Sequence, residues 1–243
     1  MKILITNDDG IAAPGLRALV KAAARLGEIT VVAPKREQSG KSHGINIHDP
    51  FEIRRVEYEG AARAYAVDST PADCVRFAIL GLKEQFDLVL SGINRGYNMG
   101  EDISYSGTCG ALFEAGTQKA KAIAFSAEWN NLEAAVPYVE PVLAFIEKHN
   151  LVEKSRLLNV NIPPNAKGIR ITRQGGPYFT DTFEKAGEDT YYQRGYCVHQ
   201  NNHDLGVDTD ATVDGYVTIT PLWICRTDTE TLEKVSGLRA DWE

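Results

Sequence analysis

The chain has 243 residues, of which 43% are hydrophobic and 24% charged, and its formal net charge is −7. This length is enough for one large domain or two small ones with a sizeable core. The negative charge argues against broad binding of nucleic-acid polymers, which needs a basic face, and no apolar run approaches the roughly 20 residues of a membrane span.

Four cysteines are scattered along the chain without a CxxC pair: Cys74, Cys109, Cys197 and Cys225. We expect them to be reduced core residues and not a disulfide framework or a zinc site. The N-terminus enters a strand pattern directly, without the features of a signal peptide. Both observations predict a cytoplasmic protein.

The first residues of the chain predict a βαβ unit. Residues 2–6 and 28–33 are apolar runs of strand length, and residues 15–26 between them have the pattern of an amphipathic helix. A helix that joins two strands at this spacing favours parallel pairing. Because ligands of parallel sheets bind beyond the carboxyl ends of the strands, the segments after residues 6 and 33 are candidates for a site.

The later elements continue this alternation. The sequence predicts extended segments within 45–67, a helix capped by Thr70 with Pro71 in its first turn, and strands at 86–90, 121–126 and 157–162. A helix is expected over 110–119. A second helix is expected over 131–149, and Pro137 and Pro141 must kink it or delay its start. Strands are expected at 169–173 and 215–220, and the polar stretch 174–214 is interpreted as an arm, a hairpin or an oligomer contact.

Two adjacent carboxylates, Asp8 and Asp9, follow the first strand. Like charges this close disfavour each other unless a cation or a proton lies between them, so the pair predicts a divalent-metal site. A plainer alternative is that one aspartate caps the following helix while the other faces water.

Neutral oxygens are expected at the same edge of the sheet. Ser39 follows the second strand, and Asn94 follows the strand at 86–90. With the two aspartates they would form an open site of hard oxygen ligands, suited to magnesium, manganese or calcium. Each residue also has an ordinary alternative role, Ser39 in a turn and Asn94 as a cap.

The segment Tyr105–Gly110 runs into a predicted helix and contains only small residues after its tyrosine. Such a segment lets backbone N–H groups point at an anion, and the helix dipole adds to the attraction. Asn98, in the preceding loop, can donate its amide to the same anion. The alternative is ordinary capping by Ser106 or Thr108.

Two other patterns are weaker. Lys35 stands where a P-loop ending at Gly40–Ser42 would need glycine, and no helix follows. His199 and His203 lie four residues apart beside Asp204, but in an irregular polar segment that does not favour a metal site.

As a whole the chain resembles the SurE family, the stationary-phase survival proteins that act as 5′-nucleotidases. The resemblance is carried in order by ILITNDDGIAAPGL (3–16), VVAPKREQSGKS (31–42), YAVDSTPADCVRFAI (65–79), DLVLSGINRGYNMGEDISYSGTCGALFEAG (87–116) and TDATVDGYVTITPL (209–222). These motifs cover most of the chain at family spacing.

The resemblance implies a three-layer α/β fold with a Rossmann-like core of mostly parallel strands over about 1–165 and a protruding C-terminal region over about 166–243, as a single domain. It implies that Asp8, Asp9, Ser39 and Asn94 hold a divalent metal, magnesium or manganese, and that phosphate contacts lie near Asn98, Ser106, Gly107 and Thr108. The implied activity is phosphate release from nucleoside monophosphates, with 3′-nucleotides or short polyphosphate as further substrates. The implied assembly is a homodimer or homotetramer.

Asp8 or Asp9 is expected to be catalytic, either by accepting a proton from the attacking water or by attacking phosphorus directly; the sequence does not choose between these. Three other classes compete with this interpretation. A receiver-type domain would need an acceptor aspartate after a later strand, where this chain has Ser91, and a haloacid-dehalogenase phosphatase needs Asp-x-Asp instead of adjacent acids. A catalytically idle nucleotide-binding protein would release no phosphate.

Overall fold

The apolar run at the N-terminus forms the central strand β1 (Lys2–Thr6). It pairs in parallel with β2 (Glu28–Pro34) on one side and with β5 (Leu88–Arg95) on the other. Because the chain leaves β1 toward one neighbour and later returns to the other, the carboxyl end of β1 is the switch point at which such sheets bind ligands. The residues that follow Thr6 lie at this point.

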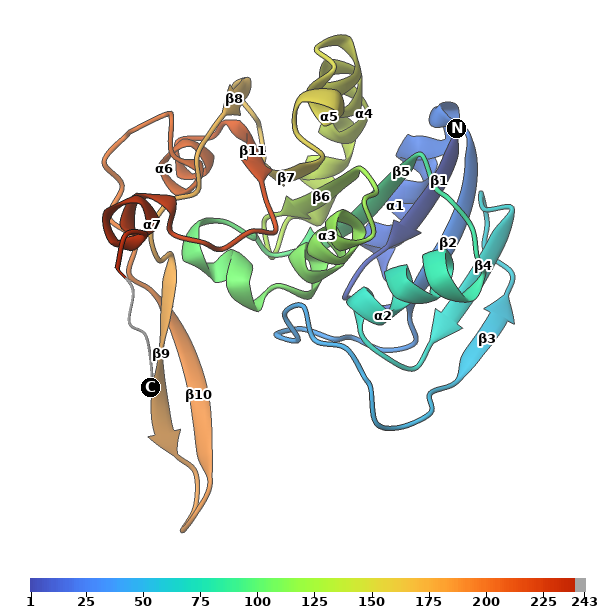
Figure 1. Cartoon of the computed structure of the whole chain (residues 1–243), viewed down its shortest axis with the longest axis horizontal. Coiled ribbons are helices and arrows are strands. Elements are labelled where there is room, and N and C mark those ends of the chain that lie inside the picture. Colours follow the sequence, from blue (N-terminus) through green and yellow to red (C-terminus); the bar gives the residue numbers. More distant parts are fainter. Residues whose placement is uncertain (239–243) are drawn as a thin grey trace.

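The computed structural model describes residues 1–238, so residues 239–243 of the expected C-terminal region lie outside the described residues. One nine-stranded sheet runs in the order β3-β4-β2-β1-β5-β6-β7-β11-β8 (Figure 1). Strands β4, β2, β1, β5, β6 and β7 are parallel, whereas β3 and β11 run antiparallel to β4 and β7. The other strands of this sheet are β3 (Ile53–Val56), β4 (Arg63–Val67), β6 (Ala122–Ala127), β7 (Leu157–Ile162), β8 (Ile169–Ile171) and β11 (Val217–Leu222).

Helices cover both faces of the sheet. Their bounds are α1 (Pro14–Ala23), α2 (Pro71–Arg76), α3 (Gly107–Thr117), α4 (Leu132–Lys148), α5 (Leu151–Lys154), α6 (Asp208–Val213) and α7 (Thr229–Val235). Successive side chains of a strand point to opposite faces. Ile3 and Ile5 accordingly pack with α1 and α4, whereas Leu4 packs with α2 and α3. The three-layer, Rossmann-like arrangement expected from the sequence is confirmed.

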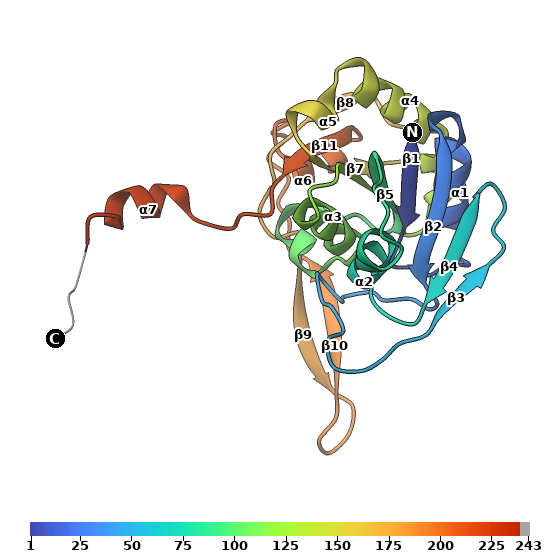
Figure 2. The same ribbon diagram turned by 45° about the vertical axis from the view of Figure 1, so that its right-hand side comes forward.

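The polar stretch after β8 contains an exposed antiparallel hairpin of β9 (Phe179–Lys185) and β10 (Tyr191–Cys197). We call residues 175–197, which lead into this hairpin and form it, the arm. The arm projects from the sheet in both views (Figures 1 and 2), and α7 stands away from the rest of the molecule in Figure 2. Within the described part of the chain, no helix is long and apolar enough to cross a membrane.

Several predictions of individual elements were wrong. Pro137 and Pro141 were expected to kink the helix over 131–149 or to delay its start, but α4 begins at Leu132, so its start is not delayed. Both prolines lie one turn apart on its exposed face, where the carbonyls they leave unpaired can meet water. Residues 45–48 form no strand. Cys74 and Cys109 are buried free thiols, but Cys197 and Cys225 are exposed and do not belong to the core.

Candidate active site

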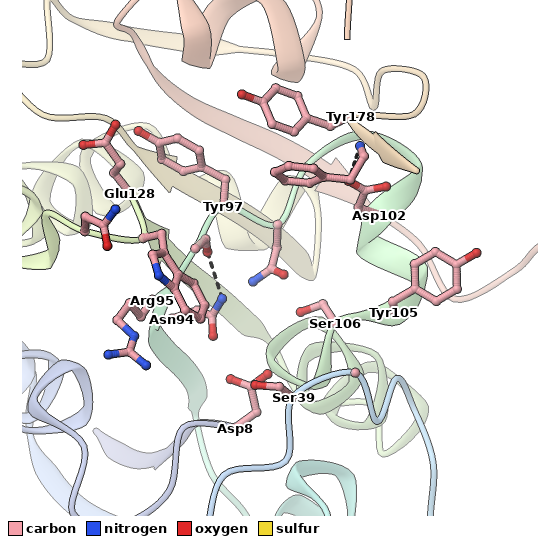
Figure 3. Close-up of a pocket in the computed structure, with 16 residues that line it drawn as sticks. Asp8, Ser39, Asn94, Arg95, Tyr97, Asp102, Tyr105, Ser106, Glu128 and Tyr178 are labelled. Carbon is pink, nitrogen blue, oxygen red and sulfur yellow. Dashed lines mark hydrogen bonds between the residues drawn. The ribbon is translucent and has the colours of Figure 1, made fainter. Parts of the chain in front are cut away.

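A cavity of about 640 Å³ opens at the carboxyl edge of the sheet (Figure 3). Loops after β1, β2, β5 and β6 line it, together with the first residues of the arm. Figure 3 shows Asp8, Ser39 and Ser106 toward one side and Glu128, Tyr97 and Tyr178 toward the other. We call these sides the acidic end and the aromatic end.

Asp8 is the buried centre of the acidic end, with only 4% of its surface exposed. Its two carboxylate oxygens accept hydrogen bonds from Thr108, one from the backbone N–H at 3.2 Å and one from the hydroxyl at 2.7 Å. Burial raises the pKa of Asp8, and the two bonds from Thr108 oppose that rise. Thr108 therefore orients Asp8, and its polar groups point at this carboxylate instead of lining the cavity.

Gly107 allows the first turn of α3 to reach Asp8. A Cβ atom at Gly107 would lie 2.9 Å from Oδ2 of Asp8 and 3.3 Å from the carbonyl oxygen of Gln38. Any larger residue would force the helix or the carboxylate to move. The requirement for glycine at position 107 therefore comes from the close approach of the helix backbone to Asp8.

Asp9 lies beside Asp8 but does not line the cavity. Its Oδ2 accepts a hydrogen bond of 3.3 Å from the backbone N–H of Arg95. Burial and the neighbouring charge of Asp8 raise the pKa of Asp9 to about 6. The two adjacent carboxylates therefore repel each other when both are charged, as the sequence suggested. A cation beside them would reduce this repulsion.

Ser39 and Asn94, both expected at this edge of the sheet, line the cavity. The Ser39 hydroxyl donates to Glu37 at 2.7 Å, so its lone pairs remain available. Asn94 lies within β5, which runs to Arg95, and not beyond its end as the sequence suggested. Its amide nitrogen donates to the carbonyl of Gly96 at 2.8 Å, which leaves its Oδ1 as a free acceptor.

Glu37 is a third carboxylate near the aspartates that the sequence did not single out. Its charge contributes to the raised pKa of both Asp8 and Asp9. The backbone beside it is fixed, because the N–H of Gln38 donates to the carbonyl of Asp8 at 2.7 Å.

Helix α3 begins at Gly107, three residues before its predicted start, and Ser106 caps it by accepting from the N–H of Cys109 at 3.0 Å. The N–H groups of Thr108 and Gly110 also have acceptors, the Asp8 carboxylate and the Ser106 carbonyl. Among the described residues, the N–H of Gly107 is the one in the first turn without an acceptor. A helix N-terminus with a free N–H is suited to an anion.

Asn98 lines the cavity but is held from three sides. Its side-chain amide donates to the hydroxyl of Ser126 at 2.8 Å, and its backbone exchanges hydrogen bonds with Asn159 and Asn161. One of its two amide hydrogens remains for a ligand.

The acidic end fits a divalent cation by the chemistry of its donors. The described residues contain no group of three or more histidine, cysteine, aspartate or glutamate side chains that could hold a metal, so a metal here would need neutral oxygens besides Asp8 and Asp9. Ser39 and Asn94 supply such oxygens. The buried Oδ1 of Asn7, next to Asp8 in the chain, has no hydrogen-bond partner among residues 1–238.

The aromatic end was not predicted from the sequence. Tyr97, Trp129, Tyr178 and Phe179 line it, together with Glu128. The guanidinium of Arg95 lies 4.7 Å from the ring centroid of Trp129. Glu128 and Trp129 could have been predicted to lie near the site, because they directly follow a parallel strand. Nothing in the linear sequence indicated Tyr178 or Phe179.

A buried carboxylate joins the arm to the loop between β5 and α3. Asp208, with no exposed surface, accepts from the N–H groups of Gly100 at 3.0 Å and Gly175 at 2.7 Å. Next to it, the N–H of Phe179 donates to Asp102 at 3.0 Å. The aromatic rings of the arm and the loop that carries Asn98 are therefore held as one unit.

His199 and His203, in the polar stretch, belong to no group of three or more potential metal ligands within residues 1–238. His199 lies 3.1 Å from a carboxylate oxygen of Asp210, and His203 lies 2.9 Å from one of Asp214. The two imidazoles thus lie beside different carboxylates.

Comparison with known proteins identifies the family. The family model described as "Survival protein SurE" matches residues 3–181. The chain belongs to the SurE family. Two relatives named 5′-nucleotidase SurE, from Desulforudis audaxviator and Desulforamulus reducens, are 37% and 38% identical to it over 100% and 98% of this chain, and the matches cover 99% and 98% of those relatives.

The fold agrees with this assignment. The crystal structure of a SurE protein from Aquifex aeolicus superposes with a TM-score of 0.80 at 33% identity, covering 97% of this chain and 98% of that one. The sequence-based resemblance to this family is confirmed.

Proposed function

We infer that the chain is a 5′-nucleotidase that releases phosphate from nucleoside monophosphates. Membership of the SurE family, whose relatives carry that name, supports this activity. One structural observation supports this activity most directly. Asp8 contacts the first turn of α3 at one end of a cavity that is large enough for a nucleotide. The opposite end offers aromatic rings on which a base can stack.

We propose that a divalent cation, magnesium or manganese, is held by Asp8, Asp9, Ser39 and Asn94. SurE nucleotidases depend on metal in general, and the donors described above are hard oxygens of the kind these ions prefer. Such an ion supplies a Lewis acid for the phosphate and lowers the pKa of a bound water.

The remaining chemistry belongs to the residues of the chain. The free N–H of Gly107 and the second amide hydrogen of Asn98 would hold phosphate oxygens, with Ser106 setting the helix end that presents them. The contact with Thr108 that the sequence suggested would be indirect, through Asp8. Asp8 or Asp9 would accept the proton of the attacking water or attack phosphorus directly.

A substrate screen tests this function. Phosphate release would be measured from 5′- and 3′-nucleoside monophosphates and short polyphosphate, with magnesium, manganese or a chelator. We expect 5′-monophosphates to be hydrolysed with metal and not with chelator. Absence of phosphate release from every nucleotide with every metal would contradict the proposal.

We propose that the protein assembles as a homodimer or homotetramer through its two projections. Apolar side chains are exposed on the arm, where 67% of Phe183 is accessible, and on α7 and the residues after it, where 50% of Leu232 and 78% of Leu238 are accessible. Exposed apolar groups of this kind mark association surfaces. Light scattering after gel filtration would measure the mass, and a monomer would contradict the proposal.

We further propose that the core and the C-terminal region act as one domain, since Tyr178 and Phe179 complete the cavity that the core begins. The free thiols of the described residues support a cytoplasmic location.

A further inference from the structure

Glu128 is a carboxylate of the cavity that the proposed chemistry does not use. It directly follows β6, is half-buried and lines the aromatic end. Figure 3 shows it on the side of the cavity away from Asp8. Within residues 1–238, no side chain or backbone group donates a hydrogen bond to its carboxylate or forms an ion pair with it. A half-buried carboxylate that faces a cavity without a partner is available to a ligand that donates hydrogen bonds.

The surroundings of Glu128 are aromatic. Figure 3 shows the Glu128 carboxylate on the same side of the cavity as the rings of Tyr97 and Tyr178, which line that end with it. The Tyr178 ring is fixed, because it stacks on His199 with centroids 5.3 Å apart and meets Phe179 edge-on at 4.9 Å. Trp129 follows Glu128 directly in the chain. A flat ligand in this end would have rings to stack on and one carboxylate at its edge.

The chemistry of the bases decides which ligand suits this arrangement. Guanine presents two adjacent N–H donors, on N1 and on its exocyclic amino group, which match the two oxygens of a carboxylate. Adenine and cytosine place an acceptor next to their amino group, and uracil places carbonyls on both sides of its N–H. Hypoxanthine keeps the N1 donor of guanine but lacks the amino group. A carboxylate therefore accepts two bonds from guanine, accepts one from hypoxanthine, and meets an acceptor on the other bases.

We propose that Glu128 is a specificity-determining residue that accepts hydrogen bonds from the Watson–Crick edge of guanine and makes GMP the preferred monophosphate. This inference rests on the proposed nucleotidase function and assigns the base recognised at that same site. Hydrogen bonds to charged groups are among the stronger ones. GMP differs from IMP by its exocyclic amino group, and we expect the bond from this group to Glu128 to raise kcat/KM for GMP about tenfold over that for IMP.

The test compares GMP with IMP in three proteins: the natural chain, Glu128→Gln and Glu133→Gln. Glu133 lies in the first exposed turn of α4, outside the cavity, and its variant has the same change of charge. We expect kcat/KM for GMP to exceed that for IMP by about tenfold in the natural chain and in Glu133→Gln. In Glu128→Gln the ratio should fall toward one, because an amide offers one acceptor where the carboxylate offered two, and the change should appear in KM more than in kcat.

Equal kcat/KM for GMP and IMP in the natural chain, or a ratio that survives Glu128→Gln, would overturn the proposal. The ribose hydroxyls are the other donors that could bind Glu128, so 2′-deoxy-GMP is tested as a third substrate. If the natural chain loses activity on the deoxynucleotide and not on IMP, and Glu128→Gln removes that loss, Glu128 recognises ribose and the proposal is wrong.

Calorimetric binding of GMP and IMP to the same three proteins separates this inference from the proposed function. A preference for GMP in binding that depends on Glu128 would support base recognition even if no nucleotide were hydrolysed. Hydrolysis of GMP and IMP at equal rates would leave the nucleotidase function intact and overturn the inference.

Discussion

The two ends of the cavity are built in different ways. Asp8 at the acidic end is 4% exposed and is fixed by both polar groups of Thr108, with backbone packed directly against it. At the aromatic end, Trp129 and Phe179 are 55% and 50% exposed. On the function proposed above, we expect the core to determine where the phosphate reacts, and side chains on loops and on the arm to determine which molecule is held there. Changes at the acidic end should therefore alter turnover, and changes at the aromatic end should alter affinity.

The largest effect is expected from Asp8→Asn. The variant keeps an oxygen that can accept from Thr108 but removes the charge needed to bind a cation or take a proton, so phosphate release from GMP should fall by about 100- to 10,000-fold. Circular dichroism and thermal unfolding should show that the fold is retained. Asp49→Asn, at an exposed position outside the cavity, is the matched control. Activity near that of the natural chain would mean that the acidic end is not the site of reaction.

Gly107→Ala probes the close packing of the acidic end. The added Cβ would lie 2.9 Å from Oδ2 of Asp8, so α3 or the carboxylate must shift. A displacement of about 1 Å at a reacting group can lower kcat about 10- to 100-fold. Gly176→Ala is the control, since its Cβ would have no neighbour within 4 Å. Equal kcat values in the two variants would show that the first turn of α3 tolerates movement.

Trp129→Ala probes the aromatic end. Stacking on an aromatic ring contributes about 1–3 kcal/mol for each base, so the KM for nucleotides should rise about tenfold while kcat changes less. Trp223→Ala removes an exposed indole that does not line the cavity. A fall in kcat at unchanged KM would contradict the division of roles between the two ends.

The smallest effect is expected in the pH dependence of stability. Because the pKa of Asp9 is about 6 in the folded chain and 3.8 as the ordinary value, the folded state binds more protons between these values. The free energy of unfolding therefore falls as pH rises from about 4 to about 6 and then levels. Each kcal/mol corresponds to a change in Tm of about 2–4 °C in a chain of this size.

Thermal unfolding with and without magnesium or manganese measures this effect. Below the pKa of Asp9, protons compete with the cation, so the rise in Tm on adding metal should be larger at about pH 7.5 than at about pH 5. Asp9→Asn should reduce both the slope without metal and the response to metal. A response to metal that is equal at both pH values would argue against Asp9 as a ligand.

The sequence predicted the acidic end because its residues obey local rules. Asp8 and Ser39 follow apolar runs of strand length, and the carboxyl ends of parallel strands necessarily meet at one edge of the sheet. Asn94 was placed at that edge even though β5 extends further than expected. Glu37 was missed because its effect depends on how its side chain turns toward the aspartates, and charge patterning along the chain does not contain that information.

The aromatic end depends on contacts between distant segments. Tyr178 reaches the cavity because Gly175 and Gly100, 75 residues apart in sequence, share the carboxylate of Asp208. No periodicity or spacing expresses that contact. The start of α4 ahead of its two prolines was not predicted for a related reason, because whether a helix tolerates a proline depends on which side of the helix faces water.

The hydrogen bonds of Asp208 also limit which segments can be replaced by those of another SurE protein in a chimera. It accepts hydrogen bonds from the loop after β5 and from the start of the arm, and burial leaves no water to replace either donor. A chimera that received only the arm of another SurE protein would keep this carboxylate but lose the match between the two segments. The smallest transferable unit for changing base selection is therefore the arm, α6 and the loop that carries Gly100, moved together.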